Sequence, residues 1–180
     1  PYTAEQVTEL KRCSRDPVYF AKKYVWIQNP KKGAMIFDMY PYQEEMMYAY
    51  KEHRFNIVLS ARQTGKSITS AIYLLWFSMF HFDKTILIAS NKNSNAMEMS
   101  QRIRYAYERM PSWLKPGVLE DGWNKHNIGF DNGSRIISTA TSEDSGRGLS
   151  ISLLFLDEFA FVSPGIQDEF WTSIEPTLST

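Results

Sequence analysis

The residues best suited to chemistry form one run in the first half of the chain, Ser60-Ala61-Arg62-Gln63-Thr64-Gly65-Lys66-Ser67, called the P-loop below. Apolar residues precede it at 57–59 and follow it from Ile68, which predicts a strand, a loop and a helix. Such a loop wraps backbone N–H groups around phosphate oxygens at the positive end of a helix. Lys66 is placed to reach the β- and γ-phosphates, and Ser67 to give its hydroxyl to Mg²⁺.

One position departs from the usual P-loop pattern, because Ser60 occupies the place of the first glycine. Serine is small, so a tight turn is still compatible with the sequence. The competing interpretation is a Gly-Lys-Ser run that arose by chance in a surface loop, a risk that every short motif carries.

A second candidate pair, Asp157 and Glu158, follows an apolar run at residues 153–156. This is the form of a Walker B motif, in which Asp157 holds the Mg²⁺ and Glu158 orients and polarises the attacking water. An apolar strand that ends in Asp-Glu is common, and on its own it also fits the start of a solvated loop. The P-loop and this pair in one α/β pattern favour a nucleotide site over coincidence.

Gln43 lies upstream of the P-loop in a segment that Pro41 opens as a helix. A glutamine amide both donates and accepts hydrogen bonds, so Gln43 can read the edge of an adenine. An exposed glutamine on a helix is the competing interpretation, and without further information it is the one that the sequence favours.

Periodicity and turn residues predict elements that alternate along the chain. Helices are expected after Thr3, after Asp16-Pro17, from Pro41, at residues 68–80, from Ser94 to Pro111, and after Pro164. Strands are expected at residues 56–59, 85–89, 128–130, 135–139 and 151–156, with loops at 113–123 and 142–148. The pattern predicts an α/β fold with a mostly parallel open sheet and helices on both faces, in which ligands bind at the carboxyl ends of strands.

Composition sets outer limits on the function. The 180 residues suffice for one domain with a substantial core, and 43% apolar with 22% charged residues is ordinary for a globular protein. A net charge of zero argues against a protein whose whole surface binds nucleic acid, although a local basic patch is compatible with it.

The single cysteine, Cys13, excludes an internal disulfide and fits a reducing compartment. The most apolar stretch, residues 68–82, is too short to span a bilayer, and no signal peptide is visible after Pro1.

These motifs resemble those of the N-terminal ATPase domain of the large terminase subunit of tailed bacteriophages, the DNA-packaging motor. The matching segments, in order, are residues 16–20, 40–43, 60–67, 113–117, 131–134, 147–148 and 156–161. They cover nearly the whole chain. In that family the P-loop often lacks the first glycine and carries an arginine. Arg62 is the arginine at this place in the present sequence.

The resemblance implies a P-loop NTPase of the ASCE type that uses ATP and Mg²⁺. It implies that Tyr42 and Gln43 form the adenine-binding motif, that the P-loop holds the phosphates, and that Glu158 is the catalytic carboxylate. It also implies an arginine finger, for which Arg62 is the candidate within one subunit and Arg147, between two glycines, the candidate that reaches a neighbouring subunit.

The resemblance further implies double-stranded viral DNA, a portal protein and a small terminase subunit as partners. It implies a homo-oligomeric ring on the procapsid, or a monomer for the isolated domain, in the host cytoplasm at the portal, with no membrane partner. Residues 1–40 are expected to be an N-terminal helical attachment and residues 41–180 the ATPase core. The family's coupling motif and nuclease domain are expected after Thr180 and are absent from the sequence.

Two other functions fit part of the pattern. A superfamily-2-type helicase also combines an upstream glutamine, a P-loop and Asp-Glu, but residues 157–160 do not form the usual helicase box and no second motor domain fits in the chain. A module that binds ATP without turning it over is the alternative from a different class.

Overall fold

The computed structural model describes residues 2–178, so Pro1, Ser179 and Thr180 lie outside the described residues. The chain divides into two compact units. Unit 1 comprises the residues up to Phe80 together with Arg102–Lys115, and unit 2 comprises His81–Gln101 together with the residues from Pro116 onward. The division into an attachment, residues 1–40, and a core, residues 41–180, stays a prediction.

Unit 1 is mostly helical. Its elements are α1 (Ala4–Arg15), α2 (Pro17–Tyr24), the antiparallel hairpin β1 (Trp26–Asn29) and β2 (Gly33–Ile36), α3 (Pro41–Glu52), α4 (Lys66–Phe80) and the second half of α5 (Asn93–Arg109). The start signals predicted from the sequence are confirmed. Thr3 and Gln6 form a capping box on α1, and the Asp16 carboxylate accepts the first N–H groups of α2.

Helix α4 forms the centre of unit 1, because nearly all of its faces are buried. The indole nitrogen of Trp76 donates to the carbonyl of Cys13 in α1 (2.7 Å), and the hydroxyl of Tyr73 donates to the carbonyl of Tyr50 in α3 (3.0 Å). These bonds satisfy the polar ends of side chains whose rings fill the interior. Helix α4 is therefore held by both neighbouring helices.

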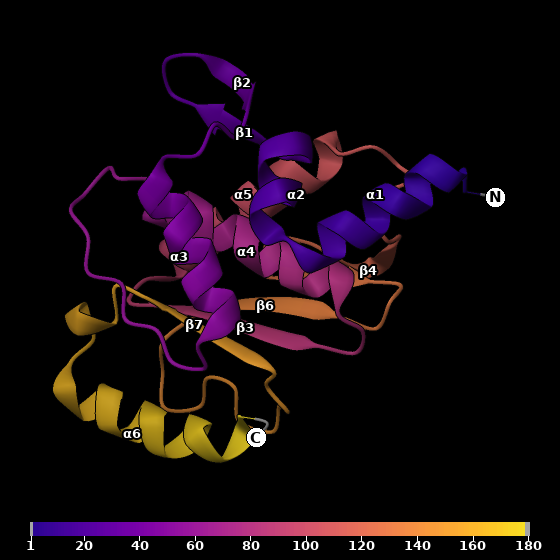
Figure 1. Cartoon of the computed structure of the whole chain (residues 1–180). Coiled ribbons are helices and arrows are strands. Elements are labelled where there is room, and N and C mark those ends of the chain that lie inside the picture. The colour runs from indigo at the N-terminus through magenta and orange to yellow at the C-terminus, as the bar shows by residue number, and fades with distance from the viewer. Residues whose placement is uncertain (1, 179–180) are drawn as a thin grey trace. The chain divides into compact units, whose positions relative to one another are not determined.

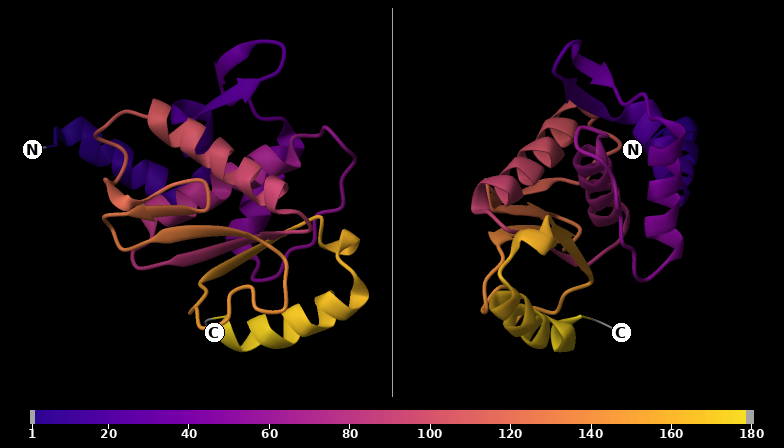
Figure 2. Two further views of the ribbon diagram at one scale, coloured as in Figure 1. Left: turned by 180° about the vertical axis from the view of Figure 1, so that it is seen from behind. Right: turned by 90° about the vertical axis from the view of Figure 1, so that its left-hand side faces the viewer.

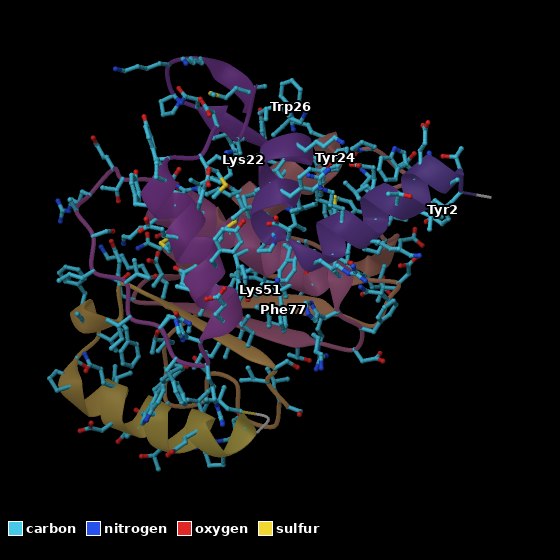
Figure 3. All side chains as sticks on the ribbon, in the orientation of Figure 1. Tyr2, Lys22, Tyr24, Trp26, Lys51 and Phe77 are labelled. Carbon is cyan, nitrogen blue, oxygen red and sulfur yellow. The ribbon has the colours of Figure 1, made fainter. Side chains whose placement is uncertain are left out.

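Two lysine side chains, both labelled in Figure 3, form polar contacts between helices of unit 1. The ammonium group of Lys22 on α2 lies 2.7 Å from the carboxylate of Glu44 on α3. The ammonium group of Lys51, at the other end of α3, donates to the backbone carbonyl of Arg15 in α1. The first turn of α3 is thus anchored next to α2, and this turn carries Gln43.

Unit 2 is built on one five-stranded sheet in the order β4-β5-β6-β3-β7 (Figure 1). Its strands are β3 (Thr85–Ser90), β4 (Val118–Trp123), β5 (Asn127–Phe130), β6 (Arg135–Ala140) and β7 (Leu153–Asp157). Strand β3 pairs in parallel with both β6 and β7, while β4 and β5 extend the sheet by antiparallel pairing. The predicted hairpin around Gly133 is confirmed.

Helices cover both faces of this sheet, as predicted. Helix α6 (Pro164–Ile174) buries Phe170 and Ile174 against Leu87 and Ala89 of β3, and the views in Figures 1 and 2 show it running along the sheet. On the opposite face, Ser100 in the first half of α5 is hydrogen-bonded to Ser138 of β6. Two short 3-10 helices, Phe159–Phe161 and Glu175–Thr177, flank α6. The predicted α/β class is confirmed.

The strand predicted at residues 56–59 is wrong. These residues belong to no helix or strand, and Ile57 and Leu59 are each 99% exposed. A strand needs a neighbouring backbone to pair with its N–H and C=O groups, and no described residue pairs with this run. An apolar tripeptide before a P-loop therefore does not form a strand by itself.

The loop predicted at residues 113–123 is wrong in its second half, because Val118–Trp123 form β4 and pair with β5. Helix α5 also begins at Asn93, one residue before the predicted cap at Ser94. Among residues 2–178, none of the helices has the length and apolar character needed to cross a membrane.

Candidate nucleotide site

The P-loop leads directly into the first turn of α4, where Lys66 and Ser67 are the first two helical residues. Gln63 and Gly65 have left-handed backbones, with φ of 63° and 78°. Left-handed residues in a turn before a helix are typical of anion-binding nests, and the helix end adds its positive dipole. The backbone of the loop is therefore suited to phosphate.

Thr64 organises the loop internally. Its hydroxyl donates to the carbonyl of Ala61 (3.0 Å) and to the hydroxyl of Ser60 (3.3 Å). Ser60, which replaces the usual glycine, thus adds a side-chain acceptor that a glycine would lack. The carbonyl of Gly65 accepts the N–H and the hydroxyl of Thr69, at 3.1 Å and 3.0 Å, which closes the first turn of α4.

The structure brings Tyr42 and Gln43 to the P-loop. The Tyr42 hydroxyl and the Gln43 amide both donate to the carbonyl of Thr64, at 2.6 Å and 3.2 Å. Gln43 is only 3% exposed, so the alternative of an exposed glutamine is wrong. The ring of Tyr42 stacks on Tyr40 at 5.7 Å between centroids. The adenine-binding role of Tyr42 and Gln43 stays a prediction.

Other candidate side chains of unit 1 differ in their exposure. Arg62 and Gln63 are exposed, whereas Lys66 and Ser67 are half-buried. The Arg62 guanidinium extends from an exposed part of the loop, while the backbone of Lys66 belongs to α4. The P-loop residues 60–65 therefore lie before α4, and Lys66 and Ser67 lie in its first turn.

Unit 2 carries the second candidate pair at the end of β7. Asp157 is the last residue of the strand and lies in register with Ser90 at the end of β3. Glu158 follows with a left-handed backbone, φ 54° and ψ 32°, which is uncommon for a residue other than glycine. The backbone therefore changes direction directly after the strand.

The sequence analysis missed two asparagines, one of which contacts Glu158 directly. The side-chain amide of Asn95, in the first turn of α5, donates to the Glu158 carboxylate (3.1 Å) and to the Asn91 side-chain oxygen (3.0 Å). The Ser90 hydroxyl also donates to Asn91 (3.3 Å). The available signal was their position after the predicted strand 85–89, since carboxyl ends of neighbouring parallel strands converge.

Arg147 lies in an exposed loop of unit 2 and forms an ion pair with Asp144 at 2.6 Å. Both side chains are largely exposed, so the pair adds little to stability. The loop is anchored at Gly146, where a Cβ atom would lie 2.3 Å from a methyl carbon of Ile174. The neighbouring carboxyl group of Glu143 raises the pKa of Glu169, in α6, through hydrogen bonding and charge repulsion.

The described residues contain few candidate ligands for Mg²⁺. Among residues 2–178, no three His, Cys, Asp or Glu side chains gather as a metal site. The predicted Mg²⁺ site at Ser67 and Asp157 stays a prediction; in nucleotide sites Mg²⁺ takes one or two protein oxygens and completes its shell with phosphate and water. A Ser hydroxyl and an Asp carboxylate are ligands of the right chemistry.

Comparisons with known proteins concern the family and the fold of the chain. The family model described as "Terminase large subunit, T4likevirus-type, N-terminal" matches residues 57–179. The chain is similar in structure to the HK97 bacteriophage large terminase, which is known from a crystal structure. The match covers 91% of the chain, with a TM-score of 0.69 and 18% sequence identity. The match spans 35% of that terminase, so the chain corresponds to about a third of its length. At this identity the structural likeness concerns the fold.

Proposed function

This chain belongs to the family of N-terminal regions of terminase large subunits of the T4-like type, and from that membership we propose that it hydrolyses ATP to drive double-stranded viral DNA into a preformed procapsid. The observation that carries the proposal is the P-loop, with left-handed Gln63 and Gly65, leading into α4 at Lys66. It offers backbone N–H groups, a helix dipole and an ammonium group to phosphate.

Each candidate residue has a role in this reaction. The P-loop backbone binds the phosphates, and Lys66 neutralises charge on the β- and γ-phosphates. Ser67 and Asp157 would hold a Mg²⁺ ion, which would compensate further phosphate charge. Glu158 orients a water molecule and accepts its proton as the water attacks the γ-phosphorus and ADP leaves.

The arginines complete the proposal. Arg62 stabilises the charge on the transferred phosphoryl group within its own subunit, and Arg147 does so for a neighbouring subunit in an assembled ring. The proposed partners are viral DNA, the portal protein and the small terminase subunit. The proposed setting is the host cytoplasm at the procapsid portal, where the chain acts in a ring, or as a monomer when isolated.

A hydrolysis assay tests the proposal. We expect the purified chain to release phosphate from ATP in the presence of Mg²⁺, and we measure the rate with and without double-stranded DNA. ATP binding without phosphate release would favour a nucleotide-binding module instead. ATP-dependent separation of DNA strands would favour a helicase. Either result would contradict the packaging ATPase.

A further inference from the structure

We propose that the hairpin of β1 and β2 contacts the phosphate backbone of double-stranded DNA, through Lys31 and Lys32 at its tip. The inference rests on the proposed function only in naming DNA as the polyanion. It concerns unit 1 alone, which contains the whole hairpin.

Unit 1 is strongly basic, although the chain has no net charge. It holds 15 of the 20 Lys and Arg residues but 8 of the 20 Asp and Glu residues, a surplus of seven positive charges. Unit 2 carries the opposite surplus. The zero net charge of the chain therefore conceals a basic half, and a basic surface is the electrostatic feature that attracts nucleic acid.

The lysines of unit 1 differ in whether a carboxylate neutralises them. On α2, the ammonium group of Lys22 lies 2.7 Å from the carboxylate of Glu44. Lys31 and Lys32, in the hairpin, are exposed, and no carboxylate among residues 2–178 pairs with either of them. Their charge is therefore available to a phosphate, and its binding to DNA would release condensed counterions.

The tip of the hairpin is ordered although it is exposed. The side-chain oxygen of Asn29 accepts the backbone N–H groups of Lys31 (2.9 Å) and Lys32 (3.0 Å). Gly33 then has a left-handed backbone, with φ 70°, which returns the chain into β2. Because these bonds fix the backbone that carries both lysines, less conformational entropy is lost when they bind.

The base of the hairpin is anchored in unit 1, whereas one of its faces is exposed. The N–H of Phe37 donates to the carbonyl of Val25 (2.8 Å), and both side chains are buried. Toward the tip, the paired residues Gln28 and Ala34 are exposed and share a face with Trp26, which is 37% exposed.

Figures 1 and 2 show the hairpin projecting from the helices of unit 1. The major groove of DNA admits a two-stranded ribbon of this kind, and lysines at its tip then reach the phosphates. Contacts to phosphate carry no sequence information, so this surface would bind duplex DNA of any sequence.

The test measures binding of a short fluorescein-labelled DNA duplex, without nucleotide, at several salt concentrations. Lys31→Gln together with Lys32→Gln removes two charges and keeps the backbone bonds to Asn29. The matched control is Lys11→Gln together with Lys125→Gln, since both residues are exposed and lie outside the hairpin. Lys31→Arg together with Lys32→Arg retains the charge of the tip.

We expect the Gln pair in the hairpin to weaken DNA binding at least about tenfold near 0.1 M salt. The slope of log K against log salt concentration should fall by about two, because two phosphate contacts are lost. The control pair and the Arg pair should keep an affinity and a slope close to those of the unsubstituted protein.

Two results would overturn the inference. Equal losses in the hairpin pair and the control pair would mean that only net charge matters, and unchanged binding in the hairpin pair would place the DNA contact elsewhere. Weaker binding of polyglutamate with unchanged DNA binding would also overturn it, because the hairpin would then face an acidic protein. ATP hydrolysis without DNA is measured separately, and its absence in the unsubstituted protein would contradict the proposed function and not the DNA contact.

Discussion

The two segments that precede the candidate residues have the same character in sequence and opposite structures. Residues 57–59, before the P-loop, form no strand, and both Ile57 and Leu59 are 99% exposed. Residues 153–156, before Asp157, form β7, which pairs in register with β3 and packs Leu154 and Leu156 against the cluster around Phe170.

The difference shows which elements position each half of the candidate site. Asp157 and Glu158 are placed by a sheet, through the backbone ladder to β3. The P-loop is placed by the helices on either side of it, through Tyr42 and Gln43 of α3 and the first turn of α4. The predictions below probe these two halves separately.

The largest effect is expected at Lys66. Lys66→Ala removes the ammonium group that compensates phosphate charge, and it leaves α4 with an alanine, a good helix former. We expect ATP hydrolysis and packaging to be abolished with an unchanged circular-dichroism spectrum. Hydrolysis near the unsubstituted rate would contradict the P-loop assignment.

Each half also carries one candidate arginine finger, and each is expected to contribute a factor of about 10³ or more. Arg62→Ala should lower the rate in any state of assembly, because Arg62 would act in its own subunit. Arg147→Ala should lower it only in a ring. Mixing Arg147→Ala subunits with Glu158→Gln subunits should restore part of the activity, since an intact site can then neighbour an intact arginine. No recovery in demonstrably mixed rings would argue against action between subunits.

A smaller effect is expected at Glu158. Glu158→Gln removes the charge that polarises water but keeps an oxygen for the bond from Asn95. We expect hydrolysis to fall at least ~100-fold, the usual scale for a lost general base, with ATP affinity nearly unchanged. Single-turnover rates and calorimetry measure the two quantities. A collapse of binding with high residual turnover would make Glu158 a structural residue.

The sequence predicted most of the fold because its signals are local. Thr3 with Gln6 and Asp16 with Pro17 define helix starts through bonds within one turn, and the structure contains them. The glycine at position 133 likewise defines a hairpin within four residues. The strand at 56–59 was predicted from the same kind of signal, and there the outcome depends on a partner backbone that a local pattern does not specify.

In the candidate site, too, local signals were predicted and contacts that depend on the tertiary fold were missed. The P-loop and Asp157-Glu158 were visible because each motif is continuous in the sequence. Asn95 lies 63 residues before Glu158, so their hydrogen bond depends on how β3, α5 and β7 come together. The burial of Gln43 was missed for a related reason, since an amide that bonds to a loop 21 residues away has no signature in its own helix.

The smallest effects concern the free energy of unfolding, and they test the comparison between residues 57–59 and residues 153–156. Leu154→Ala should lower the free energy of unfolding by about 1–2 kcal/mol, below the 2–5 kcal/mol typical of a fully buried leucine, because Leu154 is only half-buried. Leu59→Ala should change it by less than about 0.5 kcal/mol, as expected for an exposed side chain. Both free energies are measured by denaturant unfolding. The dependence of the free energy on denaturant concentration must be the same for both variants.

The matched pair decides between two views of residues 57–59. If Leu59→Ala is nearly neutral, this run is solvated and the P-loop depends on α3 and α4 for its order. If Leu59→Ala costs as much as Leu154→Ala, Leu59 is packed in solution, and the contrast between the two segments fails. Because both substitutions remove the same atoms, the difference between them reports burial and not side-chain chemistry.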